Sequence, residues 1–210
     1  MKYYPAFLDL KNRKAVVVGG GRVAERKVRS LLKAGALVKV VSPAVTPGLK
    51  KLADQGKVVH KKKSYGKGDL RGAFIVIAAT SSAVVNSKAA KEADHLVNII
   101  DQPAEGNFIV PSLVSRGNLT IAISTGGASP AVSKAVRKEI EGKYDAEFAR
   151  YLRFVEQVRG KALKEIPDAK KKERFLKSLA SDEILGLLRK RGFEKASGEV
   201  MKAFDKINRS

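Results

Sequence analysis

The stretch AVVVGGGRVAERKV, from Ala15 to Val28, places three glycines between an apolar run and a segment with helical spacing. Four consecutive apolar residues that end at Val18 are typical of a strand buried on both faces. Apolar residues then recur near the period of a helix up to Leu32, and Gly35 is placed to end that helix. The stretch therefore predicts a strand, a tight glycine turn and a helix.

The same pattern continues to about Gly142: short β-rich runs alternate with helix-like segments. This alternation is the pattern of βαβ units and a parallel sheet, so we predict an α/β fold. Beyond Gly142 helix formers dominate and predict a separate helical region. The β-rich runs are residues 15–19, 37–42, 58–60, 74–80, 95–100, 108–114 and 119–125.

The three glycines fit the dinucleotide-binding form G-x-G-x-x-G/A inside the strand-turn-helix context that its mechanism requires. Gly21 would let the backbone approach a pyrophosphate, and the small Ala24 would let the helix pack closely on the strand. Unpaired amides at the helix N-terminus would receive the phosphates. The alternative is a glycine-rich turn that binds nothing. The candidate cofactor-binding residues here are Gly19, Gly20, Gly21, Arg22, Val23 and Ala24.

The second β-rich run ends at Ser42 and Pro43, where a carboxylate would normally bind the ribose of the adenosine half. Ser42 remains able to hydrogen-bond that ribose. No arginine stands beside it to favour a 2′-phosphate, so we favour NAD over NADP as the cofactor.

Polar residues follow two further runs at the carboxyl edge of the predicted sheet. Thr80, Ser81 and Asn86 are candidates for the nicotinamide side of the cofactor, and the alternative is a capped turn that starts the next helix. Asp101 follows the next run and is a candidate proton acceptor. The alternative for Asp101 is an Asx-turn before Pro103.

A second loop of small residues contains Ser124, Thr125 and Gly126, directly before a helix that we expect to start at Ser129 and Pro130. We expect this loop to face the same sheet edge as the first glycine loop. The two loops would then share one cleft, in which the second contacts the substrate. The alternative is that Gly126 and Gly127 only turn the chain.

The composition gives a formal charge of +21, from 42 Lys and Arg against 21 Asp and Glu. Such a field attracts nucleic acid or a small polyanion. The charge is not gathered in a tail and aromatic residues are few, so we expect no nucleic-acid partner. The chain has no cysteine, and His60 and His95 have no partner at metal-binding spacing, so we predict no metal site and a redox chemistry supplied by a cofactor.

The sequence shows neither a run of about 20 apolar residues nor a signal peptide. We therefore expect a cytoplasmic protein without a membrane partner.

Several segments taken together resemble one family, the precorrin-2 dehydrogenases, whose domain also occurs in siroheme synthases. The resemblance implies a Rossmann-type domain over 1–112, a dimerisation region over 113–143 and a small helical C-terminal domain over 144–210, assembled as a homodimer. It also implies NAD-dependent oxidation of precorrin-2 to sirohydrochlorin in siroheme biosynthesis, with ferrous iron insertion by some members. Asp101 matches the family's functional aspartate. The resembling segments are 4–28, 40–43, 77–86, 98–101, 107–112 and 123–130.

The chain departs from the family pattern at four positions. Ser81, Ser82 and Gln102 stand where acidic residues are common, and Thr125 stands where serine is common. The chain ends at Ser210, so we expect no methyltransferase domain. Two other functions stay open at this point: a non-catalytic NAD-sensing Rossmann protein and a stand-alone sirohydrochlorin chelatase.

Overall fold

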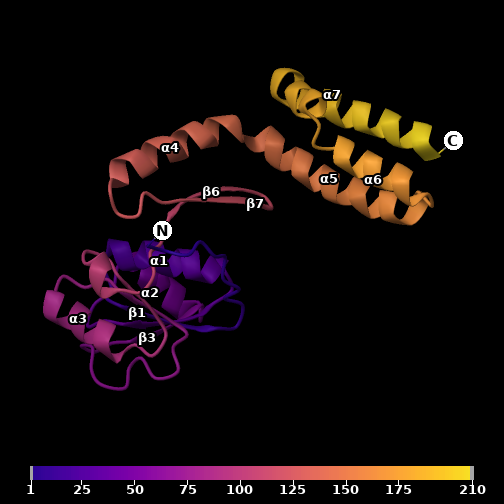
Figure 1. Cartoon of the computed structure of the whole chain (residues 1–210). Helices are drawn as coiled ribbons and strands as arrows, with labels where there is room; N and C mark the ends of the chain where they lie inside the picture. Colours follow the sequence, from indigo (N-terminus) through magenta and orange to yellow (C-terminus); the bar gives the residue numbers. More distant parts are fainter. Residues whose placement is uncertain (1, 209–210) are drawn as a thin grey trace. The chain divides into compact units, whose positions relative to one another are not determined.

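A computed structural model describes residues 2–208. The described residues form two compact units, one that ends at Val110 and one that begins at Pro111 (Figure 1).

The first unit is built on a sheet of five parallel strands in the order β3-β2-β1-β4-β5. This order confirms the predicted α/β fold, because β2 and β3 follow on one side of β1, and β4 and β5 then follow on its other side. The strands are β1 (Lys14–Val18), β2 (Leu37–Val41), β3 (Val58–Lys61), β4 (Ile75–Ala78) and β5 (Leu96–Ile99). The helices are α1 (Arg22–Lys33), α2 (Pro47–Asp54), α3 (Ala83–Glu92) and the 3₁₀ turn η1 (Pro103–Glu105).

Helices cover both faces of this sheet, which explains why β1 is apolar throughout. Alternate residues of a strand point to opposite faces. Ala15 and Val17 accordingly belong to the core beneath α1 and α2, whereas Val16 and Val18 belong to the core beneath α3. All four side chains are at most 1% exposed.

The segment between β3 and β4 is a loop, and its lysine run is exposed. Asp69 anchors this loop: its carboxylate accepts a hydrogen bond from the Gly66 amide at 2.9 Å and pairs with Lys63 at 2.8 Å. Burial raises the pKa of Asp69, but the contacts with Lys63 and Gly66 outweigh burial, and the pKa lies below its ordinary value. The loop is therefore held in one conformation where it passes the carboxyl edge of the sheet.

The second unit begins with an antiparallel hairpin of β6 (Ser112–Arg116) and β7 (Leu119–Ile123). The expectation that these two β-rich runs continue the parallel sheet is wrong, because they form a separate antiparallel sheet. The expectation that the loop after β7 faces the edge of the parallel sheet stays a prediction. Only Gly117 and Asn118 connect them. A two-residue connection suits a hairpin, whereas neighbouring parallel strands need a crossover of a dozen residues or more.

Four helices complete the second unit, and the first and the last of them begin at serine residues that cap the helix. Ser129 accepts a hydrogen bond from the Val132 amide at 3.3 Å, with Pro130 as the first helical residue, as predicted. Ser181 likewise caps the last helix. The helices are α4 (Pro130–Lys143), α5 (Ala146–Glu165), α6 (Ala169–Ser178) and α7 (Asp182–Asn208).

Helices α5, α6 and α7 share a core that includes Tyr151, Phe175 and Phe204. Helix α7 breaks at Gly192, whose φ is 78°. Glu147 of α5 accepts a hydrogen bond from the Phe193 amide at 3.0 Å and so caps the helical segment after the break.

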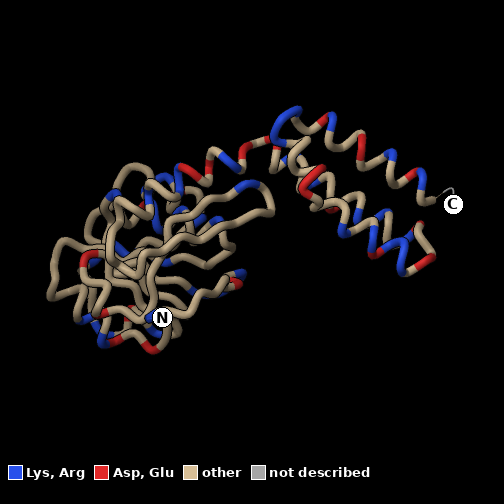
Figure 2. Tube along the Cα trace, turned by 45° about the horizontal axis from the view of Figure 1, so that its top comes forward, with Lys and Arg blue, Asp and Glu red and all other residues tan. Residues whose placement is uncertain are grey.

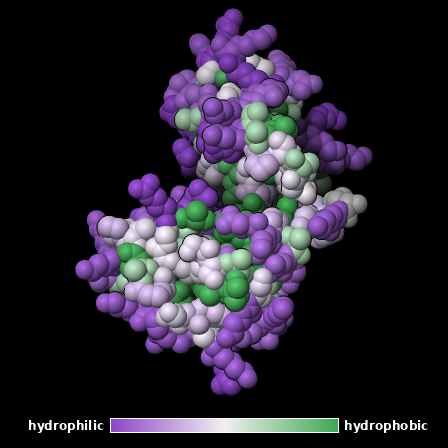
Figure 3. All heavy atoms as spheres, turned by 90° about the vertical axis from the view of Figure 1, so that its left-hand side faces the viewer, coloured by the Kyte–Doolittle hydropathy of each residue, from purple (hydrophilic) through white to green (hydrophobic). Residues whose placement is uncertain are grey.

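Lys and Arg are spread over both units and are interspersed with Asp and Glu (Figure 2). Hydrophobic residues also reach the surface in Figure 3, and the large exposed ones include Tyr4, Phe7 and Val132. Among the described residues no helix is long and apolar enough to cross a membrane.

Candidate functional site

A cleft of about 650 Å³ opens at the carboxyl ends of β1, β2 and β4. Open α/β sheets bind ligands in this position, where the strand order reverses. The cleft is lined by uncharged residues from four loops. Of the residues predicted from sequence, it brings together Gly19, Gly20, Gly21, Ser42, Pro43, Thr80 and Ser81.

The first two glycines are required by the packing of the chain itself. Gly19 has a φ of 119°, which side chains rarely adopt, and a Cβ there would overlap the carbonyl oxygen of Ala79. A Cβ on Gly20 would overlap the carbonyl oxygen of Ala44 and would lie 2.8 Å from Ser42 Oγ. These two glycines let the three loops meet, whether or not a ligand is present.

The packing of the chain does not require a glycine at the position of Gly21. Its φ is −80°, an ordinary value for any residue, and a Cβ on it would meet no protein atom within 4 Å. Because Gly21 lines the cleft, a side chain at this position would occupy space in the cleft itself. The third glycine therefore keeps open a space that no part of the described chain fills.

The uncapped start of α1 follows directly on Gly21, although Arg22, Val23 and Ala24 do not themselves line the cleft. No side chain caps this helix, and the amides of Arg22, Val23 and Ala24 have no acceptor within the described residues. The Arg22 side chain is exposed, Val23 is half-buried, and Ala24 is fully buried against the sheet as its small size predicted. Uncapped amides at a helix N-terminus bind anions, so the start of α1 fits a pyrophosphate.

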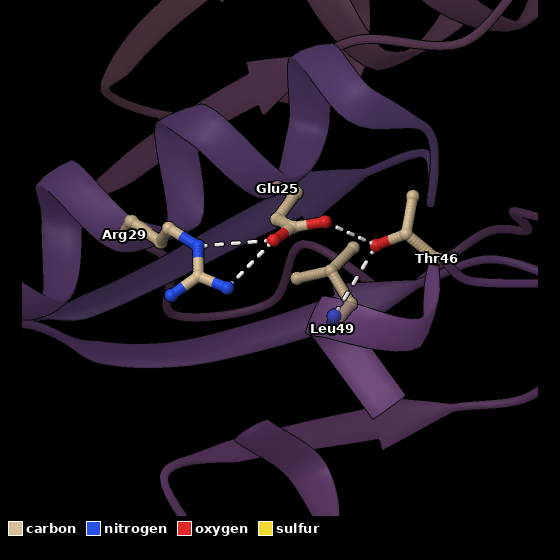
Figure 4. Close-up of polar contacts among 4 residues, drawn as sticks. All are labelled: Glu25, Arg29, Thr46 and Leu49. Carbon is tan, nitrogen blue, oxygen red and sulfur yellow. Dashed lines mark hydrogen bonds and ion pairs between the residues drawn. The ribbon is translucent and has the colours of Figure 1, made fainter. Parts of the chain in front are cut away.

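A hydrogen-bond network joins α1 to the loop before α2 (Figure 4). The Thr46 hydroxyl donates to Glu25 at 2.6 Å and accepts from the Leu49 amide at 3.2 Å. The other carboxylate oxygen of Glu25 pairs with Arg29 at 2.7 Å. The Thr46 hydrogen bond and then the Arg29 contacts hold the pKa of Glu25 below its ordinary value. Since the Thr46 amide also donates to the Gly20 carbonyl at 2.9 Å, the network fixes one wall of the cleft.

Ser42 is 8% exposed, and its hydroxyl donates to the Ala44 carbonyl at 2.7 Å. The lone pairs of the hydroxyl remain free, so Ser42 can accept a hydrogen bond from a ligand but has already used its proton. The Ser42 carbonyl contacts His60 Nε2 at 2.9 Å. His60 therefore supports the end of β2.

The opposite wall is the loop after β4. Thr80 and Ser81 line the cleft, whereas Asn86 is 4% exposed and lies behind them. The Asn86 carboxamide accepts hydrogen bonds from the amide and hydroxyl of Thr80 and donates to its carbonyl at 3.1 Å. Asn86 thus supports the wall. Ser82 caps α3, so the capped turn weighed from sequence is also present.

Asp101 is exposed and follows β5 at the same edge of the sheet as Gly19 and Thr80. Within the described chain its carboxylate accepts no hydrogen bond and forms no ion pair, so the Asx-turn interpretation is wrong. Asp101 does not line the cleft itself. Its carboxylate is available to a molecule bound at this edge.

The second small-residue loop lies in the second unit, between β7 and α4. Ser124 Oγ accepts a hydrogen bond from the Gly126 amide at 3.0 Å. The Thr125 hydroxyl contacts the carbonyl of Ser129 at 3.1 Å and accepts from its amide at 3.1 Å. Thr125 therefore holds the loop against the start of α4.

Sequence reasoning missed three residues that build the cleft. Thr46 and Tyr65 line it, and Glu25 fixes Thr46. Thr46 carried a local signal, because a threonine before Pro47 is a typical helix start. Tyr65 and Glu25 act through contacts distant in sequence, and no local pattern marks them. The residues described include no group of three or more His, Asp or Glu able to hold a metal ion.

Comparison of the chain with known proteins identifies its family. Residues 6–112 match a family described as "Putative NAD(P)-binding", and residues 116–143 match one described as "Sirohaem biosynthesis protein central". The precorrin-2 dehydrogenase of Priestia megaterium is 33% identical over 193 residues, which cover 90% of this chain and 96% of that protein. The chain belongs to the precorrin-2 dehydrogenase family. The family resemblance seen in the sequence is thereby confirmed.

Other members of the precorrin-2 dehydrogenase family agree with this placement. The solved structure of SirC, a precorrin-2 dehydrogenase, has 30% sequence identity and a TM-score of 0.84, and the match covers 97% of this chain and all of that one. The siroheme synthase of Thioalkalivibrio sulfidiphilus is 37% identical over 204 residues, which cover 96% of this chain but 42% of that protein. The chain thus spans less than half the length of the siroheme synthases that it matches.

Proposed function

We propose that this protein oxidises precorrin-2 to sirohydrochlorin with NAD as the hydride acceptor, in siroheme biosynthesis. One observation carries the proposal: Gly21 keeps open a space at the uncapped start of α1, in a chain that matches a precorrin-2 dehydrogenase over nearly its whole length. An NAD-sensing protein would need the same cleft. The family match favours the enzyme.

The chain binds and orients the reactants, while NAD supplies the chemistry by accepting a hydride. The amides of Arg22, Val23 and Ala24 would hold the pyrophosphate, and Ser42 and Pro43 would face the adenosine ribose. Thr80 and Ser81 would face the nicotinamide half. Precorrin-2 is a polycarboxylate, and the residues up to Gly142 carry 24 Lys and Arg against 10 Asp and Glu, so the field would attract the substrate.

Oxidation by hydride transfer also releases a proton, and we assign its acceptor or orienting group to Asp101. An exposed carboxylate without a protein partner at the carboxyl edge of the sheet is free to contact the substrate. We further assign Ser124, Thr125 and Gly126 to the substrate, because their loop presents small side chains and exposed backbone.

The test is an anaerobic assay with precorrin-2 generated in situ, in which NADH and the sirohydrochlorin spectrum are followed with and without NAD. NAD-dependent product formation would support the dehydrogenase. NAD binding without turnover would favour the sensing function instead.

Two variants of Asp101 separate its roles in the same assay. A proton acceptor contributes about a hundredfold or more, so Asp101→Asn and Asp101→Ala should both lose turnover while NAD affinity stays unchanged. An orienting carboxylate would leave Asp101→Asn clearly more active than Asp101→Ala. Asp94→Asn, an exposed aspartate before the same strand, is the matched control and should keep full activity. Normal turnover in both Asp101 variants would remove Asp101 from the reaction.

We also propose a cytoplasmic homodimer that assembles through residues 113–143. A two-stranded hairpin such as β6–β7 is marginally stable alone and gains from a partner. Leu113 is 45% exposed and Val132 is 51% exposed in this region. Sedimentation should find a dimer that Leu113→Lys weakens, while Leu163→Lys, on α5, should not. A wild-type monomer at every concentration would refute this assembly.

A further inference from the structure

We infer that Tyr65 forms the wall of the cleft against which the adenine ring of the dinucleotide packs. This inference rests on the proposed function, because it concerns the cofactor that the proposal assigns. Tyr65 lies outside the glycine motif.

The position of Tyr65 in the fold places it at the adenosine half. The adenosine ribose lies at the end of the second strand of such a sheet, which here is β2. Strand β3 lies directly beside β2, on the side away from β1. Ser64 and Tyr65 follow β3 and line the same cleft as Ser42 and Pro43.

Tyr65 is also the single aromatic residue among those that line the cleft. Its ring is half-buried and packs on the hydrophobic core that contains Val18, Val41 and Leu70. The Tyr65 hydroxyl donates a hydrogen bond to Glu92 of α3 at 2.6 Å. The hydrophobic core therefore supports the ring, and the hydrogen bond to Glu92 fixes its hydroxyl end.

The loop that carries Tyr65 is pinned on its other side by Asp69, through the Gly66 amide and Lys63. Burial and the hydrogen bond to Glu92 raise the pKa of Tyr65, so its hydroxyl stays protonated and remains a donor. A wall that is already ordered before a ligand arrives loses little conformational entropy on binding.

The chemistry of the cleft suits a neutral aromatic base. Its lining residues carry no charge, so a phosphate has no ion-pair partner here and depends on hydroxyl groups and main-chain amides such as those of α1. A purine offers a flat π-face, which packs well on an aromatic side chain. Removal of such an aromatic typically weakens binding by roughly five- to 150-fold.

The experiment measures the binding of two probes by calorimetry: NAD, and inorganic pyrophosphate, which lacks the base. Tyr65→Leu removes the aromatic face but keeps apolar volume, and Tyr65→Phe keeps the ring but loses the hydroxyl. We expect Tyr65→Leu to bind NAD about tenfold more weakly, with unchanged affinity for pyrophosphate. Tyr65→Phe should retain most of the NAD affinity. Tyr4→Leu is the control, because Tyr4 is 91% exposed and does not line the cleft.

Each other outcome overturns the inference in a distinct way. Equal NAD affinity in Tyr65→Leu and wild type would show that the base packs elsewhere. A parallel loss of NAD and pyrophosphate binding would show that Tyr65 only supports the loops. Failure of the wild-type protein to bind NAD would overturn the proposed function itself, and the assignment of Tyr65 with it.

Discussion

Gly21→Ser should stabilise the protein and weaken its binding of NAD. Gly21 is the N-cap residue of α1, with φ −80° and ψ −176°, which are the extended values that a capping serine adopts. The Cβ would meet no protein atom within 4 Å. The serine hydroxyl would accept a hydrogen bond from the amide of Val23 or Ala24, and that amide would no longer be free for a phosphate.

The two effects can be given magnitudes. A better cap contributes a few tenths of a kcal/mol over glycine. The lower entropy of the unfolded chain adds about 0.4–1 kcal/mol. The free energy of unfolding should therefore rise by roughly 1 kcal/mol. Loss of one amide-to-phosphate hydrogen bond costs about 1.5–3 kcal/mol, which corresponds to roughly a 10- to 150-fold weaker NAD affinity.

Chemical unfolding without ligand and calorimetric titration with NAD measure the two effects separately. Gly160→Ser on α5 is the control, because its Cβ also meets open space but in the other unit, and its NAD affinity should equal that of wild type. A folded Gly21→Ser protein that binds NAD as tightly as wild type would refute the assignment of the pyrophosphate to this loop.

Two further predictions concern the packing around the cleft. Gly20→Ala should lower the free energy of unfolding by about 1–3 kcal/mol, since the new Cβ would overlap the Ala44 carbonyl; urea unfolding measures this, and unchanged stability would contradict the fixed loop. The ionised form of Glu25 stabilises the fold because its pKa is lowered. This contribution is complete above the ordinary pKa of 4.5 and is lost as the pH falls through the lowered value. Glu25→Gln should reduce the loss of stability on acidification, and an identical pH profile would show that the contact with Thr46 contributes nothing.

Local chemistry made much of the first unit predictable. The glycine turn, the buried Ala24 and the helix stop at Gly35 follow from residues that are close together in sequence. Caps such as Ser129 depend on hydrogen bonds within one turn, so they too were predictable. The position of Thr80 at the cleft was also predictable, because the carboxyl ends of parallel strands lie at the same edge of a sheet.

The features that sequence reasoning missed depend on contacts between distant residues. Tyr65 is held at the cleft by a hydrogen bond that its hydroxyl donates to Glu92, 27 residues later in the sequence. Asn86 has a side chain that suits ligand binding, yet three hydrogen bonds of its carboxamide go to Thr80. The hairpin at residues 112–123 has strand propensity but too short a connection to join the parallel sheet, so propensity alone placed it wrongly.

Because the groups at α1 that we assign to the pyrophosphate are main-chain amides beside a glycine, truncation of side chains would leave them in place. An alanine scan that removes atoms would therefore find little at this end of the cleft. The informative substitutions are those that add atoms, since any side chain at Gly21 enters the open space. We therefore expect larger residues at Gly21 to abolish the proposed NAD binding, and we expect natural variants to carry them only where that binding has been lost.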